Sequence, residues 1–207
     1  MVKSENIEWA TDEKFKNIWK GQEGLIIGRG AGRDYARKKA LDAFDGKVIG
    51  CNAAFNTRFC DAIVLMDEKV FMNNKEDYRK LANQGSYIFV INPIYPLYGV
   101  EIVGLEARKP ARCSNSFDTG FYPCRLSGYI AVNVAILMGL NPIYLYGFTP
   151  SKAIDEKVVE RSFDFDPIAD YCYNNGIKIY TTNRDPIMEL YFEYKSLSKR
   201  RCDENLS

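Results

Sequence analysis

Histidine is absent from this chain of 207 residues. Its absence excludes Ser-His and Cys-His nucleophile pairs and every histidine metal site. Any general base is therefore a carboxylate, Tyr, Lys or Cys side chain. The cysteines lack CxxC spacing, so we interpret them as free thiols of a reducing cytoplasm rather than a zinc or disulfide framework. They are Cys51, Cys60, Cys113, Cys124, Cys172 and Cys202.

Long apolar runs are also missing. No run reaches the length that crosses a bilayer, and the polar N-terminal segment lacks the apolar core of a signal peptide, so we predict a cytoplasmic protein without a membrane span. The net charge is only +1, which excludes a global field that would attract nucleic acid or membranes. The length predicts a single nucleotide-binding α/β domain over residues 1–207, with a core over about 22–195 and a polar tail at 196–207.

Short apolar segments alternate with helix-like segments along the chain. The predicted strands are Leu25–Gly28, Lys47–Asn52, Ala62–Asp67, Ser86–Asn92, Pro142–Gly147 and Ile177–Thr182, with Val100–Arg108 as an added edge strand. The predicted helices are Arg33–Phe44, Lys69–Gln84, Ser127–Met138, Asp166–Asn174 and a last one from Pro186 to about Lys195. This alternation predicts an α/β protein: a single Rossmann-like domain with a mostly parallel sheet and helices on both faces.

Three glycines at alternate positions follow the first predicted strand: Gly28, Gly30 and Gly32. Glycine permits a sharp turn and a close approach of the backbone to a ligand, and a helix that begins beyond it presents free N–H groups to a phosphate. Arg29 adds a cation with forked donors. We therefore predict phosphate contacts at Gly28, Arg29 and Gly30. The alternatives are a tight turn without a ligand and an arginine that faces solvent.

Polar residues follow the other predicted strands. Asn52 ends the second strand, Asp67 ends the third, and Ser127-Gly128 begins the helix before the Pro142–Gly147 strand. The carboxyl ends of parallel strands share one edge, so we expect these residues to converge on a ligand there. Each also fits a structural role: Asn52 in a turn, and Asp67 and Ser127 as helix N-caps.

Three segments together resemble the sialyltransferase-like Rossmann-type proteins. They are Ile26–Gly32, Gly50–Asn52 and the run from Leu126 to Phe148. The family includes bacterial lipo-oligosaccharide sialyltransferases and hydroxymethylpterin pyrophosphokinase-like proteins. The resemblance implies contacts to nucleotide phosphate and sugar at Gly28, Gly30, Asn52, Ser127 and Gly128. The histidine that serves those sialyltransferases as general base has no counterpart here.

These observations predict a glycosyltransferase that uses a nucleotide-activated sugar, CMP- or UDP-linked, without a bound metal. Asp67 or Asp155 would deprotonate the acceptor hydroxyl, and the acceptor is a glycan, a modified nucleobase or a metabolite. One alternative is Mg-ATP diphosphate transfer to a small hydroxymethyl compound, with Asp67 and Glu68 holding Mg²⁺. The other is a non-catalytic nucleotide- or nucleic-acid-binding protein. An exposed sheet edge would also permit a homo-oligomer.

Overall fold

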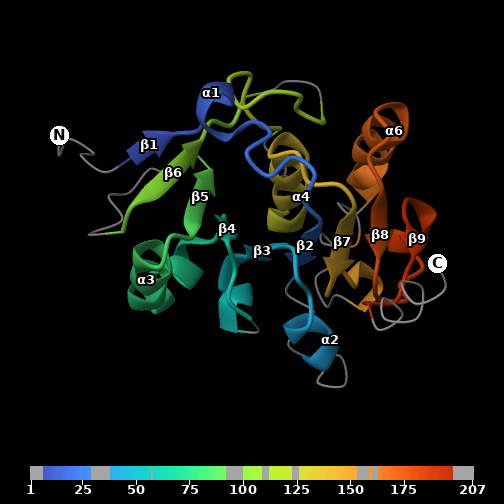
Figure 1. Cartoon of the computed structure of the whole chain (residues 1–207), viewed down its shortest axis with the longest axis horizontal. Helices are drawn as coiled ribbons and strands as arrows, with labels where there is room; N and C mark the ends of the chain where they lie inside the picture. The colour runs from blue at the N-terminus through green and yellow to red at the C-terminus, as the bar shows by residue number, and fades with distance from the viewer. Residues whose placement is uncertain are drawn as a thin grey trace.

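The computed structural model describes residues 7–28, 38–56, 58–91, 100–108, 112–122, 126–152, 159 and 163–197. Among them, parallel strands form one sheet of nine that runs through the molecule (Figure 1). Along the sheet the strands are β1 (Ile7–Trp9), β6 (Ile102–Leu105), β5 (Tyr87–Ile91), β4 (Ala62–Leu65), β3 (Lys47–Cys51), β2 (Gly24–Ile27), β7 (Ile143–Tyr146), β8 (Ile179–Thr181) and β9 (Glu193–Tyr194). The predicted α/β Rossmann-like class is confirmed.

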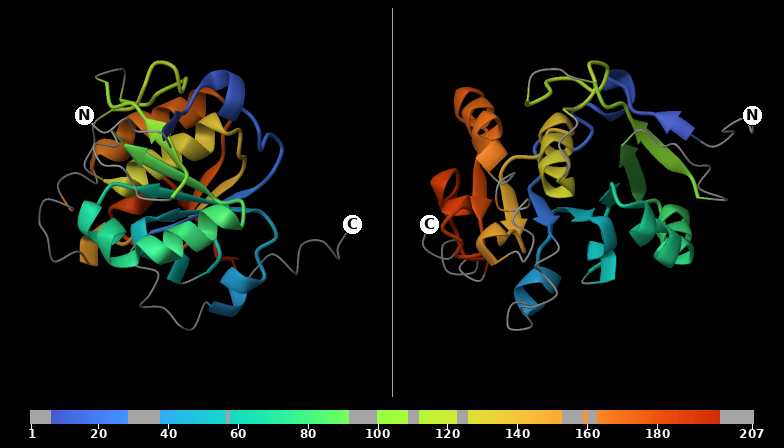
Figure 2. Two further views of the ribbon diagram at one scale, coloured as in Figure 1. Left: turned by 90° about the vertical axis from the view of Figure 1, so that its left-hand side faces the viewer. Right: turned by 180° about the vertical axis from the view of Figure 1, so that it is seen from behind.

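Helices cover both faces of the sheet. α4 (Ser127–Leu137), α6 (Asp166–Asn174) and the short α1 (Asp12–Phe15) lie on one face, and α2 (Lys38–Asp42) and α3 (Glu68–Asn83) lie on the other (Figures 1 and 2). Alternate strand residues enter the two cores, because successive side chains of a strand point to opposite faces. Thus Ile26 packs in the core with α4, and its neighbours Leu25 and Ile27 pack in the core with α3.

α4 is the central helix of the first face. Its sequence is apolar on every side, and every residue from Tyr129 to Leu137 is buried, as expected for a helix enclosed by other elements. The polar exception is Asn133, whose side chain both accepts from the N–H and donates to the carbonyl of Ser114, each at 2.9 Å. This pair fixes the segment around Ser114 along α4.

Several elements differ from the sequence prediction. Val100–Arg108 is not an edge strand, because β1, which the sequence pattern missed, pairs with β6 on its outer side. The predicted helix from Pro186 to Lys195 is wrong: this segment forms the 3-10 turn η6 (Met188–Leu190) and then β9, which pairs with β8. Ser127 is the first residue of α4, and Leu126 takes the N-cap position.

In the described part of the chain, no helix combines the length and apolar character that a bilayer span requires.

Candidate functional site

The winding of the sheet reverses between β2 and β7. β2 pairs with β3 on one side and with β7 on the other, while the chain continues outward in both directions. In open α/β sheets, ligands bind beyond the carboxyl ends of the strands at such a switch point. Gly28 and Gly147 leave the sheet there, and Asn52 follows the adjacent strand β3.

Asn52 connects three elements at this edge. Its backbone is left-handed, with φ +52°, a conformation that Asn tolerates better than most residues. Its side-chain Oδ1 accepts a 3.1 Å hydrogen bond from the N–H of Met66, just beyond β4. Its Nδ2 donates to Ser127 Oγ, on the first residue of α4, at 3.4 Å. The structure therefore brings the predicted residues Asn52 and Ser127 together and gives Asn52 the turn role that we considered as the alternative.

The first turn of α4 leaves backbone donors at this place. Tyr129 and Ile130 donate the first helical hydrogen bonds, both to the carbonyl of Leu126. The N–H groups of Ser127 and Gly128 precede them and have no partner within the helix. Both residues are only partly buried. These two donors and the Ser127 hydroxyl form a small polar edge next to Asn52.

Gly28 and Gly128 both lie against the ring of Phe148. A Cβ on Gly28 would come within 2.9 Å of the carbonyl oxygen of Gly147 and 3.0 Å of Phe148 Cδ2, and a Cβ on Gly128 would come within 2.7 Å of Phe148 Cε1. The ring is 8% exposed. The two predicted glycines are thus neighbours, and the space that they leave directly above the backbone is occupied by Phe148.

Asp67 caps the helix that follows β4. Its Oδ1 accepts hydrogen bonds from the N–H groups of Lys69, at 3.0 Å, and Val70, at 3.3 Å. Its structural role is confirmed, and its role as a base stays a prediction. The other predicted base, Asp155, and the predicted phosphate ligands Arg29 and Gly30 lie outside the described residues.

Burial removes the described cysteines from the set of possible bases. Burial raises the pKa of the Cys51 thiol to about 12, with a further increase from Cys60 and a decrease from its hydrogen bond with Ser127. Burial likewise raises the pKa of Cys60, Cys113 and Cys172 to about 12. Since a protonated thiol cannot accept the proton of a hydroxyl, these four side chains are inert at neutral pH.

Two acceptors after β8 hold the loop after β7. The side chain of Asn183 accepts from the N–H of Gly147 at 2.7 Å, and the fully buried Asp185 accepts from the N–H and Oγ of Ser151 at 3.2 and 2.5 Å. Asp185 also accepts from the N–H groups of Ile187 and Met188. Asp185 was not among the predicted site residues, although an Asp directly before a proline is a typical start of a helical turn.

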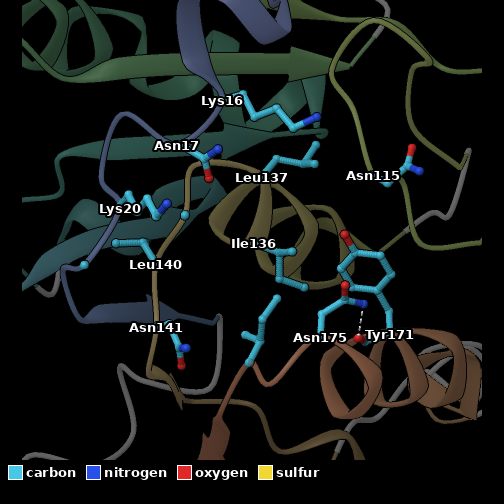
Figure 3. Close-up of a pocket in the computed structure, with 13 residues that line it drawn as sticks. Lys16, Asn17, Lys20, Asn115, Ile136, Leu137, Leu140, Asn141, Tyr171 and Asn175 are labelled. Atoms are coloured by element: carbon cyan, nitrogen blue, oxygen red, sulfur yellow. Dashed lines mark hydrogen bonds between the residues drawn. The ribbon is translucent and has the colours of Figure 1, made fainter.

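A pocket of about 480 Å³ lies at the opposite end of α4 (Figure 3). Lys16, Lys20 and Asn115 stand around its rim, and Ile136 and Leu137 line its floor. The segment over residues 17–19 closes this end of the helix, because the N–H groups of Asn17 and Trp19 donate to the carbonyls of Leu137 and Met138. Lysines near a helix carboxyl end offset its partial negative charge. The pocket thus lies near the amino ends of the strands, remote from the predicted site.

The fold is similar to that of the MAf glycosyltransferase from Magnetospirillum magneticum AMB-1, with a TM-score of 0.62 and 11% sequence identity. The match covers 91% of this chain and 38% of that chain, so the chain spans well under half of the length of this neighbour. The comparison supports the α/β Rossmann-like fold. No protein-family model and no curated protein matches the chain. The resemblance to the sialyltransferase-like family stays a prediction.

Proposed function

We propose that this chain binds a nucleotide-activated sugar at the carboxyl edge of β2, β3 and β7 and transfers the sugar to a hydroxyl group. The single observation that carries this proposal is the junction of Asn52 with Met66 and Ser127, which joins the exits of β3 and β4 to the start of α4, next to the switch point between β2 and β7. The likeness of the fold to that of a glycosyltransferase supports it.

The donor would be CMP- or UDP-linked, with its phosphate near the N–H groups of Ser127 and Gly128, which have no partner within α4, and near the glycine-containing segment over residues 28–30, for which we predict a turn. In the transfer, the acceptor oxygen attacks the anomeric carbon of the sugar. The bond from that carbon to the phosphate oxygen breaks, and the phosphate leaves with the electron pair. The proton of the hydroxyl passes to a carboxylate, for which Asp67 and Asp155 are our candidates.

Asp67 allows a clean test of the base. Asn in its place keeps an oxygen that can cap α3, because Asn and Asp are about equally good N-caps. We therefore expect Asp67→Asn to keep the melting temperature and to lower the rate of sugar transfer at least tenfold. Asp77→Asn is the matched control, since Asp77 lies on the same helix in an exposed pair with Lys80. Full activity of Asp67→Asn would exclude Asp67 as the base and leave Asp155.

The donor class can be identified by thermal shift, because a ligand that binds only the folded state raises the melting temperature. We expect CMP, UDP or their sugar conjugates to raise it, and ATP to leave it unchanged. A shift with ATP and Mg²⁺ alone would favour diphosphate transfer instead. No shift with any nucleotide would contradict the proposal.

A further inference from the structure

An ion pair joins the N-terminal regions of α4 and α6. Arg112 Nη1 lies 3.5 Å from Asp164 Oδ1, and the two side chains are 56% and 34% exposed. The backbone carbonyl of Arg112 accepts a hydrogen bond from the hydroxyl of Tyr129, a fully buried residue in the first turn of α4. Asp164 lies in the 3-10 turn η5 (Phe163–Phe165), directly before α6. The backbone of Arg112 is therefore held at the start of α4, and its side chain pairs with a carboxylate at the start of α6.

Aromatic contacts connect this ion pair to the switch point. Phe165, which follows Asp164, is 2% exposed, and its ring centroid lies 5.5 Å from that of Tyr129 and 6.3 Å from that of Phe148. Phe148 in turn contacts Gly28 and Gly128. One layer of rings thus extends from the exits of β2 and β7 to Arg112 and Asp164.

The pair is loose compared with other arginine–carboxylate pairs of the chain. Arg108 and Glu106 lie 2.6 Å apart, as do Arg184 and Glu189, whereas 3.5 Å is beyond the usual length of a hydrogen bond. A guanidinium has five N–H donors in a planar fork that suits phosphate, and this contact occupies at most one of them. Exposed ion pairs contribute little to stability, so an incoming anion can replace the carboxylate at small cost.

We propose that Arg112 binds the phosphate of the nucleotide donor and that Asp164 occupies the guanidinium while the donor is absent. This inference rests on the proposed function and names the cation of its site. Arg112 contacts Tyr129 in the first turn of α4 and Asp164 directly before α6, and the partial positive charge at these helix starts favours a phosphate. The carboxylate of Asp164 would oppose the same phosphate, so the two residues have opposite effects on binding.

The test is the dissociation constant of CMP and of UDP, measured by calorimetry on the full chain. Arg112→Ala should weaken binding of the recognised nucleotide at least tenfold, because a charge-assisted contact is lost. Arg112→Lys should weaken it less, since it keeps the charge but not the fork. Asp164→Asn should tighten binding by about two- to fivefold, because a competing charge is removed. Arg79→Ala and Glu76→Gln, an exposed pair on α3, are the controls and should change nothing.

The outcomes separate this assignment from the proposed function. If the wild-type chain binds neither nucleotide, the proposed function fails and the assignment fails with it. If the wild type binds and Arg112→Ala binds equally well, the assignment is overturned while the proposed function stands. Weaker binding by Asp164→Asn would also overturn it, because a structural ion pair loses function when either partner is removed. The backbone bond to Tyr129 remains in all these variants, so melting temperatures should stay close to wild type.

Discussion

Gly128 and Phe148 are in direct contact at the carboxyl edge of the sheet: a Cβ on Gly128 would come within 2.7 Å of Phe148 Cε1. The glycine is the second residue of α4, and the ring follows β7 and packs over Gly28 on the adjacent strand exit. The contact therefore sets how closely α4 approaches the switch point. The ligand site that we propose at this edge therefore lies beside the ring, toward Asn52 and Ser127.

Gly128→Ala should destabilise the protein by about 1–3 kcal/mol, because the added methyl group overpacks against a buried ring. Without that contact, Gly→Ala in a helix would stabilise by roughly 0.5–1 kcal/mol. Denaturant unfolding of Gly128→Ala, Phe148→Leu and the double variant measures the coupling. We expect the alanine to cost clearly less in the Phe148→Leu background, and equal costs in both backgrounds would contradict the contact.

Replacements of Asn52 should separate its two structural roles. Asn52→Gly keeps the left-handed backbone but loses the hydrogen bond to Met66, which should lower the free energy of unfolding by about 1 kcal/mol. Asn52→Ala loses the same bond and also places a Cβ at positive φ, and this backbone strain should lower the free energy of unfolding by about 1–2 kcal/mol more. The free energy of unfolding should therefore fall in the order Asn, Gly, Ala. An alanine variant as stable as the glycine variant would argue against the conformational cost.

Tyr78→Phe should be neutral or should stabilise the protein by up to about 1 kcal/mol. Within the described part of the chain, its hydroxyl is fully buried without a hydrogen-bond partner, and its ring packs against those of Phe55 and Phe71. Tyr129→Phe is the matched control, because its hydroxyl donates to the carbonyl of Arg112, and its loss should cost about 1–2 kcal/mol. Comparable losses for both variants would indicate a partner for Tyr78.

The buried thiols should make stability fall with pH above about 8.5. In the unfolded chain a thiol has a pKa of about 8.5, whereas burial raises that of Cys51 to about 12. Above pH 8.5 the unfolded state loses a proton that the folded state keeps, so the unfolding free energy decreases by about 1 kcal/mol per pH unit for each thiol. Urea titrations under reducing conditions at pH 7.5 and 9.5 measure this decrease. Cys51→Ala should show a smaller decrease, and an unchanged one would exclude Cys51 as a contributor.

The central strands were predictable because parallel strands buried on both faces read as short apolar runs between turn residues. The outermost strands were not. Ile7–Trp9 and Glu193–Tyr194 are short and partly exposed, and their pairing with β6 and β8 decides their conformation. For the same reason, tertiary pairing overrode the helix signal at Pro186.

The site was predictable only where strand ends determine it. Asn52 and Ser127 were both expected at the carboxyl edge, where parallel strands converge, and the structure places them within hydrogen-bonding distance of each other. The role of Phe148 was not visible, since glycines that admit a phosphate and glycines that admit a ring have the same sequence pattern. Arg112, to which we assign the donor phosphate, has no signal in the sequence, because its pairing with Asp164 depends on tertiary packing that no local motif encodes.

The place of β1 at the rim of the sheet has a consequence for biosynthesis. Its partner is β6, with Ile7 opposite Ile102, so β1 has no partner strand during synthesis until the segment around Ile102 has also been made. Until then its hydrogen-bonding groups are open to other strands, a hazard that grows with the separation of paired segments. Deleting residues 1–10 would leave β6 as an exposed edge strand, and we expect such a truncated protein to aggregate during expression.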